Sequence, residues 1–464
     1  MILLLGILEM LAFFGAVRGL VLSGPQAAEQ ALALCLCCAA TFYYHDLYDV
    51  GIVRGFYDFL TRLPGAIVWS GILLAVVWGL SPDLSIPAAA LGAVAAALVV
   101  TVICLRAACY ALLRCRRFRE RLVILGTGKL ARRLREEIEA RPHLRYEIVG
   151  FIAAPARRDG TIPSADLKPC LGPVQEIDRI MRESAPDKLV VALAERRGSV
   201  PVHELVQIKL DGIAVEDGEE LFEQITGRIS LEALSPSSFV FGRRSGKSRL
   251  NLAIARATSL CVSAAGLALT APLFPLIALA ILIDSRGPIF YLQDRVGLRG
   301  RRFRMLKFRT MRPTAREASA WAADNKQRIT RVGVWLRKFR LDELPQFVNI
   351  LRGDMNLEGP RPHPVSNYEL FAANIGHYAL RLAVRPGVTG WAQTRYEYAN
   401  NLEEETEKVR YDLYYIKHMS TWLDLRILFD TIKVVLLGRR SDVSGPLPTA
   451  AREGQAVRLH DTAA

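Results

Sequence analysis

The sequence lacks the motifs that most often explain a strongly basic chain. Lys and Arg outnumber Asp and Glu by 60 to 46, which gives a net charge of +14. A surplus of this size indicates nucleic acid, anionic lipid or phosphate-rich substrates as partners. No zinc-finger spacing and no RNA-binding signature occurs among the 464 residues, which argues against nucleic acid. Lipid and phosphate therefore remain as the expected anionic partners.

The eight cysteines lack the arrangement of a functional cluster. Most lie in or beside apolar runs, and the group Cys35, Cys37 and Cys38 stands inside a hydrophobic stretch without a partner cluster. We interpret them as small buried hydrophobic residues of a protein in a reducing compartment.

The N-terminal third has few charged residues and predicts a membrane region. The chain is 51% hydrophobic and has a mean hydropathy of +0.20, and its length allows two or three domains. The first apolar run lacks the basic start of a signal peptide, so we expect it to be retained as a span. Each run approaches the roughly 20 residues that a membrane helix needs. The four runs are 2–22, 27–43, 65–80 and 87–105.

The links between these runs predict their orientation. The links 23–25 and 81–83 contain no Lys or Arg, whereas the link 44–64 contains Arg54 and Arg62. By the positive-inside rule, both ends of the bundle should face the cytoplasm. Six arginines around the end of the fourth run support this orientation: Arg106, Arg114, Arg116, Arg117, Arg119 and Arg121.

A soluble α/β segment follows at about 120–240. A short apolar strand leads into a tight turn at Gly126 and Gly128 and then into a helical run, with Ala131 in the place of a third glycine. The next strand, 146–152, runs into two alanines where a dinucleotide site needs a ribose-binding acid. We expect a Rossmann-like domain with a regulatory or structural role, and NAD binding is the alternative.

The stretch 258–283 lacks charge altogether. Its 26 residues are long enough to cross a bilayer of about 30 Å. Pro272 and Pro275 lie in its middle, however, where proline breaks or kinks a helix. Basic residues flank both ends, and the positive-inside rule then places both ends on the cytoplasmic side. The sequence predicts a helix that enters the membrane and returns, with an ordinary kinked span as the alternative.

A dense cationic segment and an acidic pair follow. Between Asp284 and Glu343 there are 16 Lys and Arg residues but six Asp and Glu residues. Such a segment can bind anionic headgroups or clamp phosphates. Asp342 and Glu343 precede Pro345 and an apolar helical pattern, so we expect them at a helix N-terminus. One could attack phosphorus and the other could hold Mg²⁺, although helix capping alone also explains an acidic pair.

Several motifs in one order resemble a known family, the monotopic bacterial sugar transferases. These polyprenyl-phosphate phosphoglycosyl transferases begin exopolysaccharide and O-antigen synthesis. The upstream regions are similar to the larger members, and the opening pattern is most similar to the subgroup associated with PEP-CTERM/exosortase loci. The motifs are Gly287-Pro288, Gln293–Gly297, Lys307–Met311, Leu341–Gln346, Gly353–Pro362 and Arg385–Gln393.

The resemblance implies roles for residues that match. Asp342 matches a nucleophile that forms a covalent phosphosugar intermediate, and Glu343 matches an acid that binds Mg²⁺. Pro272 matches the proline that breaks the re-entrant helix, although Ala271 replaces the usual small polar residue before it. Five basic residues match, or lie in motifs that line, the site of the substrate phosphates: Arg295, Lys307, Arg309, Arg337 and Arg361.

The predicted architecture is a membrane protein with a four-helix transmembrane bundle (1–117), a Rossmann-like α/β domain (118–242) and an α/β catalytic domain (243–440) with a re-entrant helix at about 254–284. The tail 441–464 is expected to be disordered. The resemblance implies a UDP-sugar, a polyprenyl (undecaprenyl) phosphate and the bilayer as partners, with the catalytic domain on the cytoplasmic face of the bacterial inner membrane. It also allows a homo-oligomer and contacts with polysaccharide assembly proteins.

Other residues keep two interpretations. His363 could touch substrate or lie in a surface loop, and Trp391 could stack on uracil or pack in the core or at the interface. Lys408, Asp412 and Tyr415 could brace the site or belong to an ordinary amphipathic helix. Two rival functions are an NAD-dependent nucleotide-sugar enzyme and a scaffold without catalytic activity.

Overall fold

The computed structural model describes ten stretches of the chain, and they divide into two compact units. The first unit contains most of the chain up to Val215, and the second contains the chain from Glu216 onward with two short segments, 128–130 and 192–196. The predicted tail 441–464 lies outside the described residues. The described stretches are 2–21, 26–48, 56–114, 119–153, 167–193, 201–231, 234, 249–312, 327–396 and 399–437.

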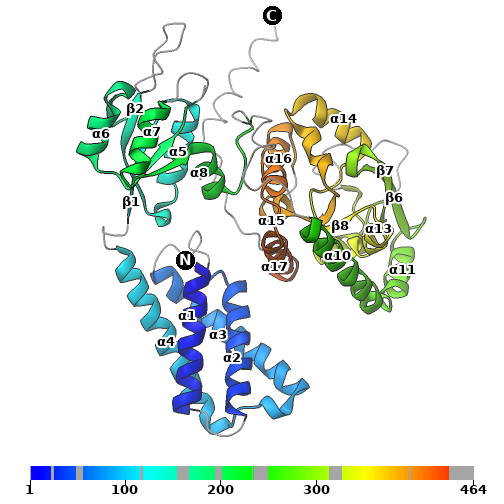
Figure 1. Cartoon of the computed structure of the whole chain (residues 1–464). Coiled ribbons are helices and arrows are strands. Elements are labelled where there is room, and N and C mark those ends of the chain that lie inside the picture. The colour runs from blue at the N-terminus through cyan, green and yellow to red at the C-terminus, as the bar shows by residue number, and fades with distance from the viewer. Residues whose placement is uncertain are drawn as a thin grey trace, which may run out of the picture. The chain divides into compact units, whose positions relative to one another are not determined.

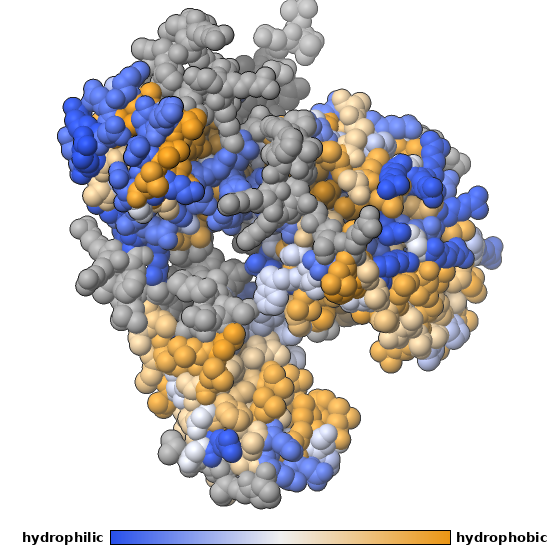
Figure 2. Space-filling model, in the orientation of Figure 1, coloured by the Kyte–Doolittle hydropathy of each residue, from blue (hydrophilic) through white to orange (hydrophobic). Residues whose placement is uncertain are grey.

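The first unit begins with four apolar helices (Figure 1). They are α1 (Ile2–Ala16), which continues as a π-helical turn to Val21, α2 (Ala27–Tyr44), α3 (Phe56–Leu80) and α4 (Ala88–Arg114). Buried aliphatic residues, cysteines and the rings of Phe13, Phe42 and Phe59 fill the core between them, and apolar side chains cover the outside, as Figure 2 shows. By length and composition, α2, α3 and 89–109 of α4 could each cross a membrane, whereas α1 is shorter. Helices α3 and α4 extend beyond the predicted runs.

A buried ion pair joins two of these helices. Glu9 of α1 and Arg106 of α4 are fully or almost fully buried, and Arg106 Nε lies 2.5 Å from Glu9 Oε1. The guanidinium also lies over the rings of Tyr48 and Phe59. Arg106 therefore belongs to the bundle interior. Counting it among the basic residues of the following loop was wrong, because α4 continues past it to Arg114.

The first unit also contains a five-stranded sheet. Its strands are β1 (Glu120–Leu125), β2 (Tyr146–Ala153), β3 (Cys170–Pro173), β4 (Lys188–Val191) and β5 (Ala214–Asp217), in the order β3-β2-β1-β4-β5. The pairs β1–β2, β1–β4 and β2–β3 are parallel. Its helices are α5 (Lys129–Glu139), α6 (Ile177–Ser184) and α7 (Val202–Leu210). The apolar strand predicted before the glycine turn is the buried central strand β1, as a parallel sheet requires.

The second unit begins with a helix that packs against its far end. α8 (Gly218–Thr226) carries Glu223, which accepts a hydrogen bond from Lys417 Nζ (2.7 Å) and pairs with His418 (2.7 Å). Trp391 Nε1 donates to Gly227 O (2.8 Å), and Ile229 and Leu234 join the core around Trp391. The described residues 218–231 and Leu234 are therefore built into this unit through buried contacts.

The rest of the second unit is a compact α/β fold. Strands β6 (Phe290–Val296) and β7 (Arg302–Phe308) form an antiparallel hairpin, and β8 (Asn356–Glu358) pairs in parallel with β9 (Gly387–Thr389). The helices around them are α12 (Arg331–Lys338), α13 (Gln346–Arg352), α14 (Val365–Asn374), α15 (Trp391–Arg395), α16 (Leu402–Lys417) and α17 (Thr421–Leu437).

The uncharged stretch forms two helices instead of one. α10 (Arg249–Thr270) ends before Pro272, which has helical angles and precedes α11 (Leu273–Asp284). Large apolar side chains of both helices are exposed, among them Leu269, Leu276 and Ile283. The predicted break at Pro272 is therefore present in the structure.

Both arms of this broken helix contact the same folded unit. In α10, Arg256 donates to Ile350 O (2.7 Å) and to Met355 O (2.8 Å) beyond the end of α13. Gly266 lies so close to Phe347 of α13 that a β-carbon would come within 2.8 Å of its ring. At the other end, Asp284 of α11 accepts a hydrogen bond from Val332 N in α12 (2.8 Å).

Candidate active site

Asp342 and Glu343 lie in a 3₁₀ turn, Leu341–Glu343, between α12 and α13. The preceding residue, Arg340, has a φ of 55°, which turns the chain sharply after α12. The prediction of a helix N-terminus is correct only in part, because α13 begins at Gln346 with Pro345 before it. Both carboxylates are more than nine-tenths buried.

Three cationic side chains surround the carboxylate of Glu343. Arg361 Nη2 donates to Glu343 Oε1 at 2.8 Å, Lys307 Nζ lies 3.4 Å away, and Arg340 Nη1 lies 3.5 Å away. Charge-assisted bonds of this kind are stronger than neutral ones. Lys307 and Arg361 were both predicted, and the structure brings them together at this one oxygen atom.

Asn349 of α13 explains how Lys307 reaches the acidic pair. Its amide nitrogen donates to Arg304 O (2.8 Å), and its amide oxygen accepts from Leu306 N (3.0 Å). The fully buried side chain thus takes the place of a neighbouring strand along β7. As a result, β7 is fixed against α13, and Lys307 comes beside the turn that carries Glu343.

Burial and neighbouring charges shift the pKa values of Asp342 and Glu343 in opposite directions. Burial raises the pKa of the Asp342 carboxyl, and the negative charge of Glu343 raises it further. Burial also opposes ionisation of Glu343, but Arg361, Lys307 and Arg340 outweigh it and hold that pKa well below its usual range. Glu343 is therefore a fixed anion, and Asp342 is the carboxyl of the pair whose protonation can change.

The other predicted basic residues have different surroundings. Arg337 Nε donates to Thr310 (2.9 Å), and its charge favours the ionised form of Asp342. Arg295 donates to Pro362 O (2.6 Å), directly after Arg361. Arg309 donates to the carbonyls of Ser285 and Arg286 at the end of α11. Its contacts thus fasten α11, whereas those of Lys307 and Arg361 are with Glu343.

Two of these cations have lowered pKa values. Burial and the neighbouring charge of Arg361 lower the pKa of Lys307 to about 8 and that of Arg295 to about 9. The positive charges of Lys307, Arg295 and Arg361 lie close together, and the two carboxylates of Asp342 and Glu343 do not neutralise all of them. A cluster of half-buried cations with this arrangement suits a ligand with several negative charges, such as a diphosphate.

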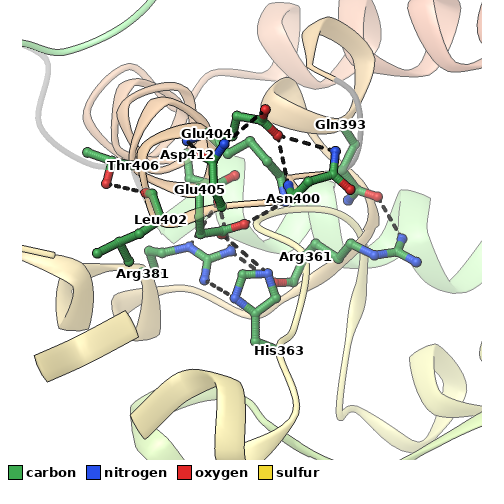
Figure 3. Close-up of polar contacts among 12 residues, drawn as sticks. Arg361, His363, Arg381, Gln393, Asn400, Leu402, Glu404, Glu405, Thr406 and Asp412 are labelled. Carbon is green, nitrogen blue, oxygen red and sulfur yellow. Dashed lines mark hydrogen bonds and ion pairs between the residues drawn. The ribbon is translucent and has the colours of Figure 1, made fainter. Parts of the chain in front are cut away.

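Residues with two sequence interpretations are now placed. His363 is buried among Tyr378, Arg381 and Glu405, so the surface-loop interpretation was wrong. Figure 3 shows its ring facing Arg381 and Glu405 of α16. Trp391 is a core residue, stacked on Tyr414 and covered by Arg395. Of the α16 residues, Asp412 forms a buried ion pair with Arg381.

Sequence reasoning missed three residues near the pair. Arg340 is three positions before Glu343, a spacing that the sequence displays. Gln393 accepts a hydrogen bond from Arg361 Nη1 (2.9 Å), and Arg381 donates to Arg361 O (2.9 Å). These two lie 32 and 20 residues from Arg361, and no local pattern links positions that far apart.

Two known protein families match separate parts of the chain. The model of the bacterial sugar transferase family matches residues 250–438, and that of a CoA-binding domain matches residues 44–211. The first match contains the broken helix, the acidic pair and all five predicted basic residues.

Several characterised relatives match over long stretches. An N-acetylgalactosaminephosphotransferase of Aeromonas hydrophila, which uses UDP-N-acetylgalactosamine and undecaprenyl phosphate by name, is 38% identical over half of the chain. An undecaprenyl-phosphate glucose phosphotransferase of Komagataeibacter xylinus is 32% identical over 70% of it. The chain covers 55% and 61% of the length of these two proteins.

A third relative is matched over a larger share of its length. It is the UDP-glucose:undecaprenyl-phosphate glucose-1-phosphate transferase of Klebsiella pneumoniae, 32% identical over 68% of this chain and 67% of its own. Together with the family match over the region that holds the acidic pair, this similarity shows that the chain belongs to the bacterial sugar transferase family.

Proposed function

We propose that the protein transfers a sugar-1-phosphate from a UDP-sugar to a polyprenyl phosphate and so begins the synthesis of an exopolysaccharide or related glycoconjugate. The observation that carries the proposal is the buried Asp342–Glu343 pair among Lys307, Arg361 and Arg340, beside an apolar broken helix. The names of the relatives support this reaction class.

The reaction would occur in two displacement steps. In the first, a carboxylate oxygen of Asp342 bonds to the β-phosphorus, and the bond from that phosphorus to the bridging oxygen breaks, so that UMP leaves with the electron pair. In the second, a phosphate oxygen of the polyprenyl phosphate bonds to the same phosphorus and frees the Asp342 carboxylate. The surrounding cations balance the charge in both steps.

Glu343 is proposed as a ligand of Mg²⁺, beside the nucleophile Asp342. In the part of the chain that the structure describes, no group of three metal-ligating acidic, His or Cys side chains occurs. Two adjacent buried carboxylates nevertheless fit Mg²⁺, which commonly takes one or two carboxylates and completes its shell with water and phosphate oxygens. When bound, the ion would neutralise charge on the phosphates.

The broken helix is proposed to enter the membrane and return. Its two arms are fastened to one folded unit, through Arg256 in α10 and Asp284 at the end of α11. A helix that crossed the bilayer once would carry these two residues toward opposite sides. The arrangement therefore supports a re-entrant helix along which the lipid acceptor reaches Asp342.

The remaining regions take supporting roles. The strand order β3-β2-β1-β4-β5 is that of doubly wound folds, which supports a Rossmann-like domain. We propose a regulatory or structural role for it, with the bundle as a membrane anchor and the catalytic region facing the cytoplasm. The proposed division stays 1–117, 118–242 and 243–440, and the contacts of α8 attach the end of the second region to the third.

A membrane-fraction assay tests the proposal. Membranes containing the protein would be incubated with Mg²⁺ and a panel of UDP-sugars, with and without polyprenyl phosphate. We expect one or a few UDP-sugars to release UMP, and sustained release to require the lipid phosphate. A scaffold would release no UMP with any sugar, and an NAD-dependent enzyme would instead change the cofactor absorbance.

A further inference from the structure

We propose that Arg381 is a positioning residue that aims Arg361 at the substrate phosphates and at Glu343. The proposal rests on the proposed function, because it assigns Arg361 to the phosphates. It goes beyond it by giving a role to a buried network around Arg381 that contains Tyr378 and three residues labelled in Figure 3: His363, Glu405 and Asp412.

The backbone on both sides of Arg361 is held in place. Gly359 N donates to Thr389 O (2.9 Å), and Gly387 N donates to Pro360 O (3.0 Å), which fixes the segment before Arg361 to β9. Arg295 donates to Pro362 O on its other side. Between these points, the Arg361 carbonyl accepts a hydrogen bond from Arg381 Nη2 (2.9 Å).

The side chain of Arg361 joins two parts of the site. Nη2 donates to Glu343 Oε1 (2.8 Å), and Nη1 donates to Gln393 Oε1 (2.9 Å). A small rotation of the backbone at this position would move the guanidinium by much more than the backbone itself. The position of the Arg361 guanidinium therefore depends on the hydrogen bond that fixes the Arg361 carbonyl, and Arg381 donates that bond.

Arg381 is itself held from several directions. Nε and Nη2 lie 2.9 and 2.8 Å from Oδ2 of Asp412, and Nη1 donates to Tyr378 Oη at 2.8 Å. The side chains of Arg381 and Asp412 are both more than nine-tenths buried. A rigid guanidinium can make these bonds and the bond to Arg361 O at the same time, whereas a lysine ammonium cannot.

His363 completes the network in one protonation state. Because an arginine can only donate, Nδ1 of His363 accepts from Arg381 (3.1 Å), and the ring proton lies on Nε2 toward Glu405 (3.5 Å). Burial and the charges of Arg381, Lys408, Arg295 and Arg361 lower the pKa of His363 well below its usual value. The neutral ring therefore adds no charge that would repel Arg381.

A double-mutant cycle tests the positioning role. We expect Arg381→Lys to lower kcat/KM for the UDP-sugar by about 10- to 100-fold, the range for a misplaced positioning group. Arg361→Lys should lower it by a similar factor. If Arg381 acts through Arg361, the double variant should resemble Arg361→Lys alone within about threefold, because the second change has nothing left to disturb.

Arg395→Lys is the matched control. Arg395 is an equally buried arginine paired with an aspartate, Asp430, in the same unit, but it makes no bond to Arg361 O. The fold-loss in kcat/KM caused by Arg395→Lys should multiply with the fold-loss caused by Arg361→Lys. The proposal would be overturned if the loss in kcat/KM caused by Arg381→Lys also multiplied with that caused by Arg361→Lys. It would be overturned as well if Arg381→Lys left kcat/KM unchanged. Thermal unfolding in detergent shows whether Arg381→Lys and Arg395→Lys are folded.

A second variant and a binding measurement complete the test. If Arg381→Lys does not fold, Asp412→Asn weakens the hold on Arg381 at the same volume and should show the same non-additivity. The affinity for the UDP-sugar that the membrane assay identifies, measured in the presence of Mg²⁺, should fall non-additively too. A wild-type protein that binds UDP-sugars but releases UMP from none of the panel would count against the proposed function, and additive losses of affinity would count against the positioning role.

Discussion

Asp342 and Glu343 are adjacent residues with nearly equal burial, yet they differ in how their charges are balanced. Glu343 contacts Lys307, Arg340 and Arg361, whereas Lys307, Arg337 and Arg361 influence Asp342 only at longer range. Neutralising Asp342 would therefore disturb the contacts of the site little, whereas neutralising Glu343 would leave several buried cations unbalanced. Substitutions at the two positions should have different consequences.

Replacing Asp342 tests the nucleophile. Asp342→Asn keeps the size of the side chain but removes the attacking oxygen anion, so we expect UMP release to fall by at least about 10³-fold. The protein should still insert into membranes and unfold at a similar temperature. Asp211→Asn, at an exposed position directly after α7, is a control that should retain activity. Substantial turnover by Asp342→Asn would contradict the assignment.

The pH dependence of the reaction should report the carboxyl of Asp342 and the ammonium of Lys307. Asp342 must be ionised to attack, and its raised pKa means that activity falls with decreasing pH while ordinary carboxyls are still ionised. Lys307, with a pKa of about 8, loses its charge as the pH rises through that value, so kcat/KM should fall there too.

Lys307→Arg separates the two limbs of the profile. Arginine stays charged throughout the measurable range, so the alkaline limb should move to higher pH while the acid limb stays. The measurement is kcat/KM from pH 5 to 10. Lys338→Arg at the exposed face of α12 is the control and should leave both limbs in place. An unshifted alkaline limb in Lys307→Arg would assign that limb to another group.

Glu343→Gln tests the metal assignment. The neutral amide is a poorer ligand for a hard cation, so the Mg²⁺ concentration for half-maximal activity should rise by at least about tenfold. A titration of UMP release against Mg²⁺ measures this change. An unchanged titration curve would show that Glu343 acts only as a counter-ion for Arg361 and Lys307.

At the scale of elements, the interruption at Pro272 decides how α10 and α11 meet the membrane. A continuous helix from Arg249 to Asp284 would be about 54 Å long, far more than the hydrocarbon thickness of about 30 Å. Because its ends are tied to α13 and α12, it would have to release one of them. The proline break thus keeps both ties intact.

The variant Pro272→Ala/Pro275→Ala should favour a continuous helix. We expect loss of lipid-dependent UMP release, together with a change in the protease accessibility of the region after Asp284 in sealed vesicles. Pro142→Ala, in a short turn of the sheet domain, is a control for proline removal and should change neither property. Full activity with unchanged accessibility would contradict the proposed membrane return.

The Glu9–Arg106 pair should couple α1 to α4. Removing one partner leaves a buried charge without its counter-ion, so Glu9→Gln or Arg106→Met alone should destabilise the bundle by about 3–5 kcal/mol. The double variant removes both charges and should recover most of that loss. Thermal unfolding in detergent measures all three proteins, and a double variant as unstable as the sum of both single variants would refute the coupling.

At the scale of the whole molecule, the sequence predicted most of what is encoded locally. The apolar helices, the glycine turn and the break at Pro272 each depend on neighbouring residues, and the structure contains them. Hydrophobic periodicity carries no information on long-range pairs. The contacts Glu9–Arg106, Glu223–Lys417 and Arg381–Arg361 join residues 97, 194 and 20 positions apart, and all were missed.

His363 shows why burial of polar residues is hard to predict. It stands in a loop between two prolines, a context typical of the surface. Its burial becomes favourable because distant elements supply polar partners: Arg381 donates to its Nδ1, and the Glu405 carboxylate lies 3.5 Å from its Nε2. The candidate site could thus be found from its motifs, whereas the network that supports it required the fold.

The packing of α8 determines where chimeric proteins can be joined. A fusion that imported only the residues of the family match, from 250 onward, would leave Lys417 without Glu223 and Trp391 without the carbonyl of Gly227. The exchangeable module therefore begins before Gly218. Shuffled genes that place their junction upstream of this helix should yield folded transferases more often than those that place it at the family border.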